Sequence, residues 1–184
     1  MAIFSFDNSN SGGGGPFNMF YGETTADGQP VYVSRTFDDY KVPPAGHYRL
    51  RLAGFAEPKE VPIAEMYRRV DGPTTKMETK LEIEITEGQG KGFRFIVSFV
   101  TFSLGDRANA FNLYVATMCN GNKKDAPAVR DWDPMIDKEF MGTVTTPKLN
   151  DDGTPKYAQL AWDSLSPVAA EGTGYNPFVK SDAA

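Results

Sequence analysis

The segment KGFRFIVSFVTFSL, residues 91–104, constrains the fold more than any other part of this chain. Apolar residues fill the odd positions from Phe93 to Phe99 and most of the even positions up to Leu104, and among the even positions only Arg94 and Ser98 are polar. The apolar side chains are largely β-branched and aromatic. This composition favours a strand over a helix. A strand with one wet face alternates apolar and polar residues, so both faces of this strand are expected to make apolar contacts. The second face either packs against another layer of the protein or binds a ligand.

Two further segments alternate with a period of two residues, which is typical of half-buried strands. In residues 47–55 the apolar side chains share one face, and Arg49 and Arg51 share the other. In residues 77–87 the apolar face is mainly aliphatic. The positions of this second segment that are expected to face outward are Glu78, Lys80, Glu82 and Glu84. GQGKG, residues 88–92, then forms a hairpin connection to the opening segment.

The period changes to three and four residues in GDRANAFNLYVATMCNG, residues 105–121, which predicts one helix near 106–119. Asp106 is the expected N-cap, and Asn120–Gly121 is the expected stop. After a loop, KEFMGTV and KYAQLAW predict a second hairpin, with its turn in NDDG.

The order of these elements is that of the OB-fold, a five-stranded, partly open Greek-key barrel. We therefore predict a mainly β, OB-fold-like domain over residues 31–168, with one helix between its third and fourth core strands. Residues 1–30 are predicted to be a Gly-rich flexible arm, because SNSGGGGP has the composition of a linker. The aromatic residues of the following FNMFYG either dock onto the domain or contact a partner. Residues 169–184 have no periodic pattern and are predicted to be a C-terminal tail.

The composition restricts the chemistry that the chain can perform. His47 and Cys119 are its only histidine and cysteine, so a Cys/His zinc site would have just two ligands, far apart in the sequence. A Cys–His catalytic pair would need these two residues to meet, and nothing at either position indicates that they do. DWDPMID, residues 131–137, spaces carboxylates as a calcium loop does but lacks the glycine and the third oxygen ligand. We therefore expect no enzymatic activity, no metal and no cofactor.

The location of the protein is also restricted by its composition. No run approaches the roughly 18 apolar residues that cross a bilayer, so no membrane partner is expected. A single cysteine cannot form an intrachain disulfide, which fits the cytoplasm.

The net charge of −5 is distributed unevenly. Residues 41–130 contain 14 Lys and Arg and 10 Asp and Glu, a balance of +4, whereas the remainder contains 5 and 14, a balance of −9. A basic centre between acidic flanks indicates either an anionic ligand at the centre or ordinary solvated charge.

Five segments carry a family likeness: VPPAGHYRLRL, TKLEIEITEGQGKGFRF, the helix after FSLGD, DKEFMGTV and DGTPKYAQLAWDSLSPV. Together, over about residues 42–168, they resemble phage-type single-stranded DNA-binding proteins. The shared pattern is Pro-x-Gly-x-Tyr at the start of a strand, Glu-Gly before a glycine hairpin, and a Tyr near the start of the last strand. The resemblance implies sequence-tolerant binding of single-stranded DNA in phage replication or recombination, in the cytoplasm of the host cell. A second copy of the chain and replication or recombination proteins are further candidate partners.

Binding a single strand without reading its sequence requires cations along the phosphates and aromatic faces on which bases stack. The predicted phosphate ligands are Arg49, Arg51, Lys76, Lys80, Lys91 and Arg94 on the first three core strands, Arg68 and Arg69 in the first long loop, and Lys123 and Lys124 after the helix. The predicted stacking residues are Tyr67, Phe93, Phe95 and Trp132. The alternatives are that Phe95 and Trp132 belong to the core and that Arg68 and Arg69 form a solvated turn.

A second interpretation belongs to a different class of function. A barrel with an apolar arm can be a phage virion or assembly protein that acts through protein–protein contacts. DNA binding through phosphate contacts weakens steeply with salt, whereas hydrophobic assembly persists, so salt dependence separates the two interpretations.

Overall fold

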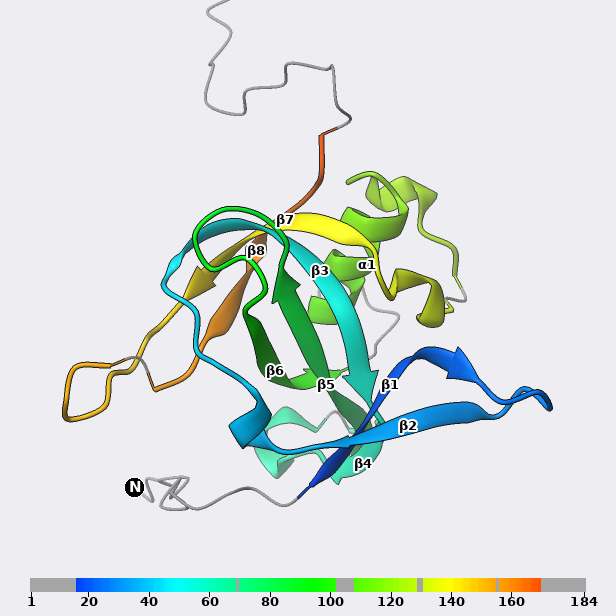
Figure 1. Cartoon of the computed structure of the whole chain (residues 1–184). Helices are drawn as coiled ribbons and strands as arrows, with labels where there is room; N and C mark the ends of the chain where they lie inside the picture. The colour runs from blue at the N-terminus through cyan, green and yellow to red at the C-terminus, as the bar shows by residue number, and fades with distance from the viewer. Residues whose placement is uncertain (1–15, 69, 102–107, 129–130, 155, 170–184) are drawn as a thin grey trace, which may run out of the picture.

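The computed structural model describes residues 16–68, 70–101, 108–128, 131–154 and 156–169. Within these residues the protein is mainly β, with eight strands in one antiparallel sheet and a single α-helix (Figure 1). The strands are β1 (Phe17–Thr24), β2 (Pro30–Arg35), β3 (Gly46–Ala56), β4 (Lys59–Pro62), β5 (Thr75–Ile85), β6 (Arg94–Thr101), β7 (Glu139–Thr145) and β8 (Gln159–Pro167), and the helix is α1 (Asn109–Met118).

Strand β3 is the centre of the sheet. One of its edges pairs with β5, and the other pairs first with β7 and then, near its end, with β1. The sheet continues from β5 to β6 and from β7 to β8, so the core path is β6–β5–β3–β7–β8. Over the described residues β6 and β8 do not pair with each other, and the sheet is not closed.

The core lies on the face of the sheet that α1 covers. Leu50 and Leu52 of β3 pair with Ile85 and Ile83 of β5, and all four side chains are fully buried. Each buried side chain of this size contributes about 1.5–3 kcal/mol relative to an exposed one. The alternation read from the sequence therefore identified the inward face of both strands.

Helix α1 lies between the third and fourth core strands, β6 and β7, where the change of period predicted a helix. It buries Leu113 and Tyr114, among others, and it packs mainly against β8. Asn120 and Gly121 have positive φ angles of 46° and 81°, and the Gly121 N–H donates to the Val115 carbonyl, so the predicted stop is present. The predicted N-cap, Asp106, lies outside the described residues.

The predicted arm differs from the structure over its second half. Residues 17–30 form β1 and its turn into β2, and Phe17 and Met19 are buried beside Ala56 of β3. The prediction extended the linker composition of residues 1–15 to the apolar residues that follow, although a glycine run gives no information about them. Residues 1–15 themselves lie outside the described residues. The hairpin covers part of the second face of residues 91–104, because Ile96 of β6 packs against this same buried group.

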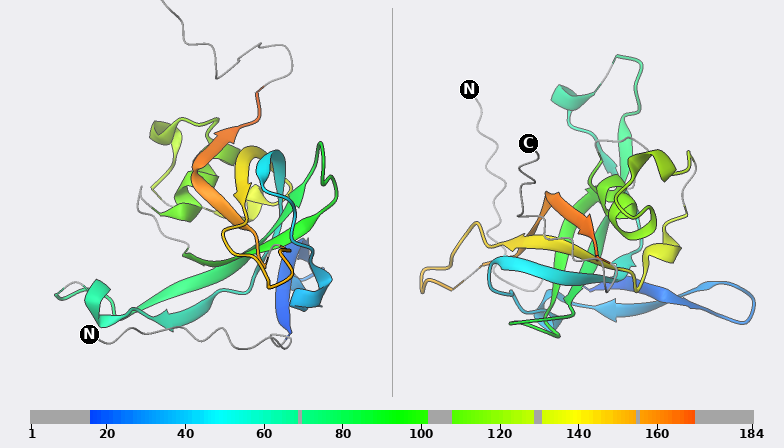
Figure 2. Two further views of the ribbon diagram at one scale, coloured as in Figure 1. Left: turned by 90° about the vertical axis from the view of Figure 1, so that its left-hand side faces the viewer. Right: turned by 90° about the horizontal axis from the view of Figure 1, so that it is seen from above.

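Two hairpins extend from the body of the protein. The connection between β1 and β2 and the connection between β4 and β5 both project away from the helix and the core strands (Figure 2). No helix in the described part of the chain has the length and apolarity that a membrane span requires.

Candidate nucleic-acid interface

A groove with a volume of about 780 Å³ opens where β6 and β8 are left unpaired. We call it the β6–β8 groove. Its lining residues are Phe37, Tyr40, Lys41, Val42, Phe95, Ile96, Val97, Ser98, Lys148, Lys156, Tyr157, Ala158, Gln159, Leu160 and Trp162. They come from the segment before β3, from β6, from the connection between β7 and β8, and from β8 itself.

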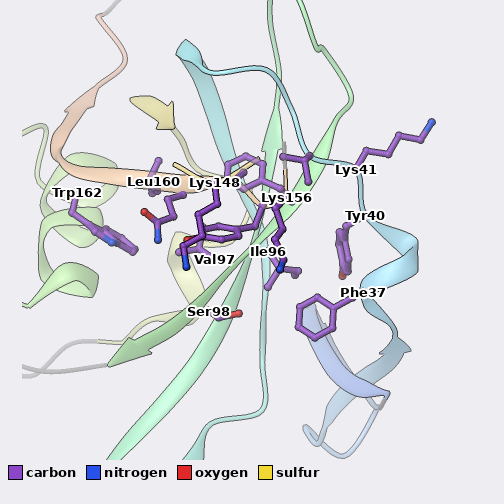
Figure 3. A pocket seen from close by; sticks show the side chains of 15 residues that line it. Phe37, Tyr40, Lys41, Ile96, Val97, Ser98, Lys148, Lys156, Leu160 and Trp162 are labelled. Atoms are coloured by element: carbon purple, nitrogen blue, oxygen red, sulfur yellow. The ribbon is translucent and has the colours of Figure 1, made fainter. Parts of the chain in front are cut away.

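Aromatic side chains stand on both sides of this groove. Figure 3 shows Phe37 and Tyr40 on one wall, Trp162 on the opposite wall, and Ser98 between them. Phe37 is 41% exposed, so its ring is accessible from solvent. The groove therefore offers aromatic faces to a ligand without requiring the core to open.

Three lysines line the same groove. Lys148 and Lys156 flank the turn between β7 and β8, and the Lys156 N–H donates to the Lys148 carbonyl at 2.9 Å, which brings the two residues together. Lys41 belongs to the aromatic wall, where its backbone N–H donates to the Arg94 carbonyl, but its side chain points away from the other lining residues (Figure 3). None of the three ammonium groups forms an ion pair with a carboxylate that the structure describes. Lys148 and Lys156 therefore give the groove positive charge that is available to an anion.

A buried carboxylate fixes the aromatic wall. Glu82 of β5 is only 1% exposed, and its Oε2 atom accepts hydrogen bonds from the Tyr40 hydroxyl at 2.6 Å and the Tyr21 hydroxyl at 2.7 Å. Arg94 donates to its Oε1 atom at 2.9 Å. Burial raises the pKa of Tyr40, and the hydrogen bond to Glu82 raises it further, so the hydroxyl stays protonated and donating.

The position of Glu82 corrects an expectation from the sequence. Alternation correctly predicted that Glu82 lies on the face opposite Leu81 and Ile83, but this face is covered at Glu82 instead of exposed. The β1–β2 hairpin and the segment that contains Tyr40 provide the cover, and both are distant from β5 in the sequence.

Lys80, a predicted phosphate ligand, lies against the same wall. Its Nζ atom is 4.3 Å from the ring centroid of Phe17 and 4.7 Å from that of Phe37. A cation at this distance from an aromatic face is attracted by the ring quadrupole. Lys80 therefore stabilises the placement of Phe37.

Two of the predicted arginine ligands form ion pairs with carboxylates. Arg49 forms ion pairs with Glu87 and Glu139, both at 2.6 Å. Arg51 forms an ion pair with Glu84 at 2.9 Å. A phosphate would have to compete with these carboxylates for either arginine.

Two more predicted cations are paired in the same way. Arg94 bridges Glu82 and Glu84 at 2.9 Å and 2.8 Å, and Lys76 pairs with Glu78. Burial by itself would raise the pKa of Glu84, but its arginine partners hold this pKa below the usual value, so the carboxylate stays ionised.

The remaining predicted cations lie away from the groove lining. Lys91 is exposed in the β5–β6 turn, and Lys123 and Lys124 are exposed in a short 3-10 helix after α1. Arg68 donates its Nε–H to the Ile63 carbonyl in the β4–β5 connection. Arg69 lies outside the described residues.

The predicted stacking residues divide into core and surface. Phe95 lines the groove but is only 2% exposed, and Trp132 packs edge-on against Tyr114 of α1 with ring centroids 5.6 Å apart. Phe93 is partly buried against the core. Tyr67 is 76% exposed on the β4–β5 connection.

The sequence reading missed most of the groove. The aromatic and basic lining residues that it missed are Phe37, Tyr40, Lys41, Lys148, Lys156, Tyr157 and Trp162. One local signal was present, because Lys148 and Lys156 flank the predicted NDDG turn and a hairpin turn brings its flanking residues together. The aromatic wall had no comparable signal.

Comparison of the chain with models of known protein families, with curated protein sequences and with solved structures gives no match. The chemistry of the groove is therefore the basis for a functional proposal.

Proposed function

We propose that this protein binds single-stranded DNA with little sequence preference, in phage replication or recombination, through the β6–β8 groove. The observation that carries the proposal is a groove in which aromatic rings face lysines that have no described carboxylate partner. Stacking of a base on an aromatic side chain is worth about 1–3 kcal/mol, and lysines follow the phosphate backbone.

The same chemistry favours a single strand over a duplex. A base must leave its stack before it can lie on Phe37 or Trp162, and single-stranded bases are already available. Lysine contacts phosphate as a flexible point charge, and an aromatic face accepts any base, so neither contact reads a sequence.

We also propose that the domain is an OB-fold-like barrel that stays open between its third and fifth core strands. The supporting observations are the β6–β5–β3–β7–β8 path and the place of α1 between β6 and β7. Ligands of OB-folds lie against the second and third core strands and their neighbouring loops, and β6 forms part of the groove lining.

The direct test is titration of fluorescein-labelled oligo-dT with the full chain, followed by anisotropy at two salt concentrations. We expect binding that weakens as salt rises, with similar affinity for oligo-dC of the same length. Absence of binding at low salt refutes the proposal. A strong preference for one base composition refutes its sequence-tolerant part.

One observation favours the alternative of a phage virion or assembly protein. The β4–β5 connection carries three exposed apolar side chains, namely Met66, Tyr67 and Val70, and Val70 is 93% exposed. Exposed apolar groups that cluster on one projection are typical of protein contacts. Self-association that persists in high salt, measured by light scattering without DNA, supports this alternative.

A further inference from the structure

We propose that the β6–β8 groove continues into a second hollow beside β4, where Lys59 and Lys80 hold a further phosphate of the bound strand. This inference rests on the proposed function and names an additional subsite for the same ligand. The hollow has a volume of about 250 Å³, and its lining includes residues of β1, β4, β5 and β6. We call it the β4 hollow.

The two cavities meet at one residue and are separated by one aromatic pair. Ser98 of β6 lines both the groove and the β4 hollow. Phe37 lines the groove, Phe17 lines the hollow, and their ring centroids are 5.2 Å apart. A strand that passes Phe37 therefore reaches the hollow by crossing Ser98.

The charges of the hollow fit a phosphate. Lys59 and Lys80 both line it, and neither forms an ion pair with a described carboxylate. Burial lowers the pKa of Lys80, and repulsion by the ammonium group of Lys59 lowers it further. An anion between them relieves this repulsion.

Two carboxylates also line the hollow, and one of them is neutralised by a lysine that lies outside it. Glu57 and Glu78 also line it, and Glu78 is paired with Lys76. Counting Lys76, the hollow has three lysines and two glutamates, which leaves one net positive charge for a phosphate. The aromatic ring of Phe17 adds an apolar surface beside that charge.

The test is a length series of labelled oligo-dT with the full chain and with Lys59→Ala. For the unmodified protein we expect affinity to rise with length and then to level off, apart from a statistical gain from overlapping sites. Lys59→Ala should leave the affinity for the shortest bound oligonucleotides unchanged. For longer ones, loss of one phosphate contact should reduce the salt slope by about 0.7 and the affinity about eightfold at 50 mM salt.

The matched control is Lys138→Ala, which removes an exposed lysine that lines neither cavity. This control should behave as the unmodified protein at every length. An equal effect of Lys59→Ala at all lengths, or no effect at any length, overturns the second subsite while the groove proposal stands. Absence of binding by the unmodified protein at every length overturns the groove proposal and the subsite together.

Discussion

Removal of the two lysines beside the β7–β8 turn tests the groove most directly. Lys148 and Lys156 are adjacent, exposed and without a described carboxylate partner. The Lys148→Ala, Lys156→Ala double variant should therefore remove two phosphate contacts and leave the fold intact, because neither ammonium group belongs to the core. We expect an unchanged urea midpoint and weaker binding to oligo-dT.

The magnitude follows from counterion release. For single strands the slope of log K against log salt is about −0.7 per phosphate contact, so loss of two contacts makes the slope less steep by about 1.4. The same relation gives an affinity loss of about 65-fold at 50 mM salt and about 10-fold at 200 mM salt. Anisotropy titrations at four or more salt concentrations measure both quantities.

The Lys123→Ala, Lys124→Ala double variant is the matched control. It removes the same charge from a short 3-10 helix that does not line the groove. We expect its salt slope to stay close to that of the unmodified protein. If both double variants lose the same slope, binding depends on overall charge, and the reasoning from the groove is wrong.

Three further changes test the wall and the arginine network. Phe37→Ala should weaken oligo-dT binding by about 1–3 kcal/mol with an unchanged salt slope, because stacking releases few counterions; a flatter slope in the same titrations contradicts this role. Tyr40→Phe removes a hydrogen bond to a buried carboxylate and should lower the free energy of unfolding by about 1.5–3 kcal/mol in urea melts. The pKa of Tyr40 is raised in the folded state, so on raising the pH its hydroxyl ionises first in the unfolded chain, and the stability of the fold falls as pH rises above about 10. Tyr40→Phe should make this fall shallower. An unchanged alkaline stability profile contradicts the role given to the Tyr40 hydroxyl. Arg49→Ala should change oligo-dT affinity less than about twofold, because Arg49 is already ion-paired with two carboxylates. The same variant should lower the free energy of unfolding by at most about 1 kcal/mol. A change in salt slope of about 0.7 would show instead that Arg49 contacts phosphate.

The sequence by itself determined the elements whose signal is local. Period-two alternation located β3 and β5 and their buried faces, and the change to a helical period located α1. Such patterns are readable because the side chains of one strand or helix share a face at fixed intervals along the chain. The side of the sheet on which Glu82 lies was determined in the same way.

Only the tertiary structure decided what covers each face and which charges are free. Glu82 is buried because the β1–β2 hairpin and the segment that contains Tyr40, 42 residues away in the sequence, cover it. Arg49 is neutralised by Glu139, 90 residues away, whereas Lys148 and Lys156 meet no described carboxylate. The groove itself exists because β6 and β8 approach without pairing. Contacts of this kind depend on how distant segments pack, and no local period in the sequence records that packing.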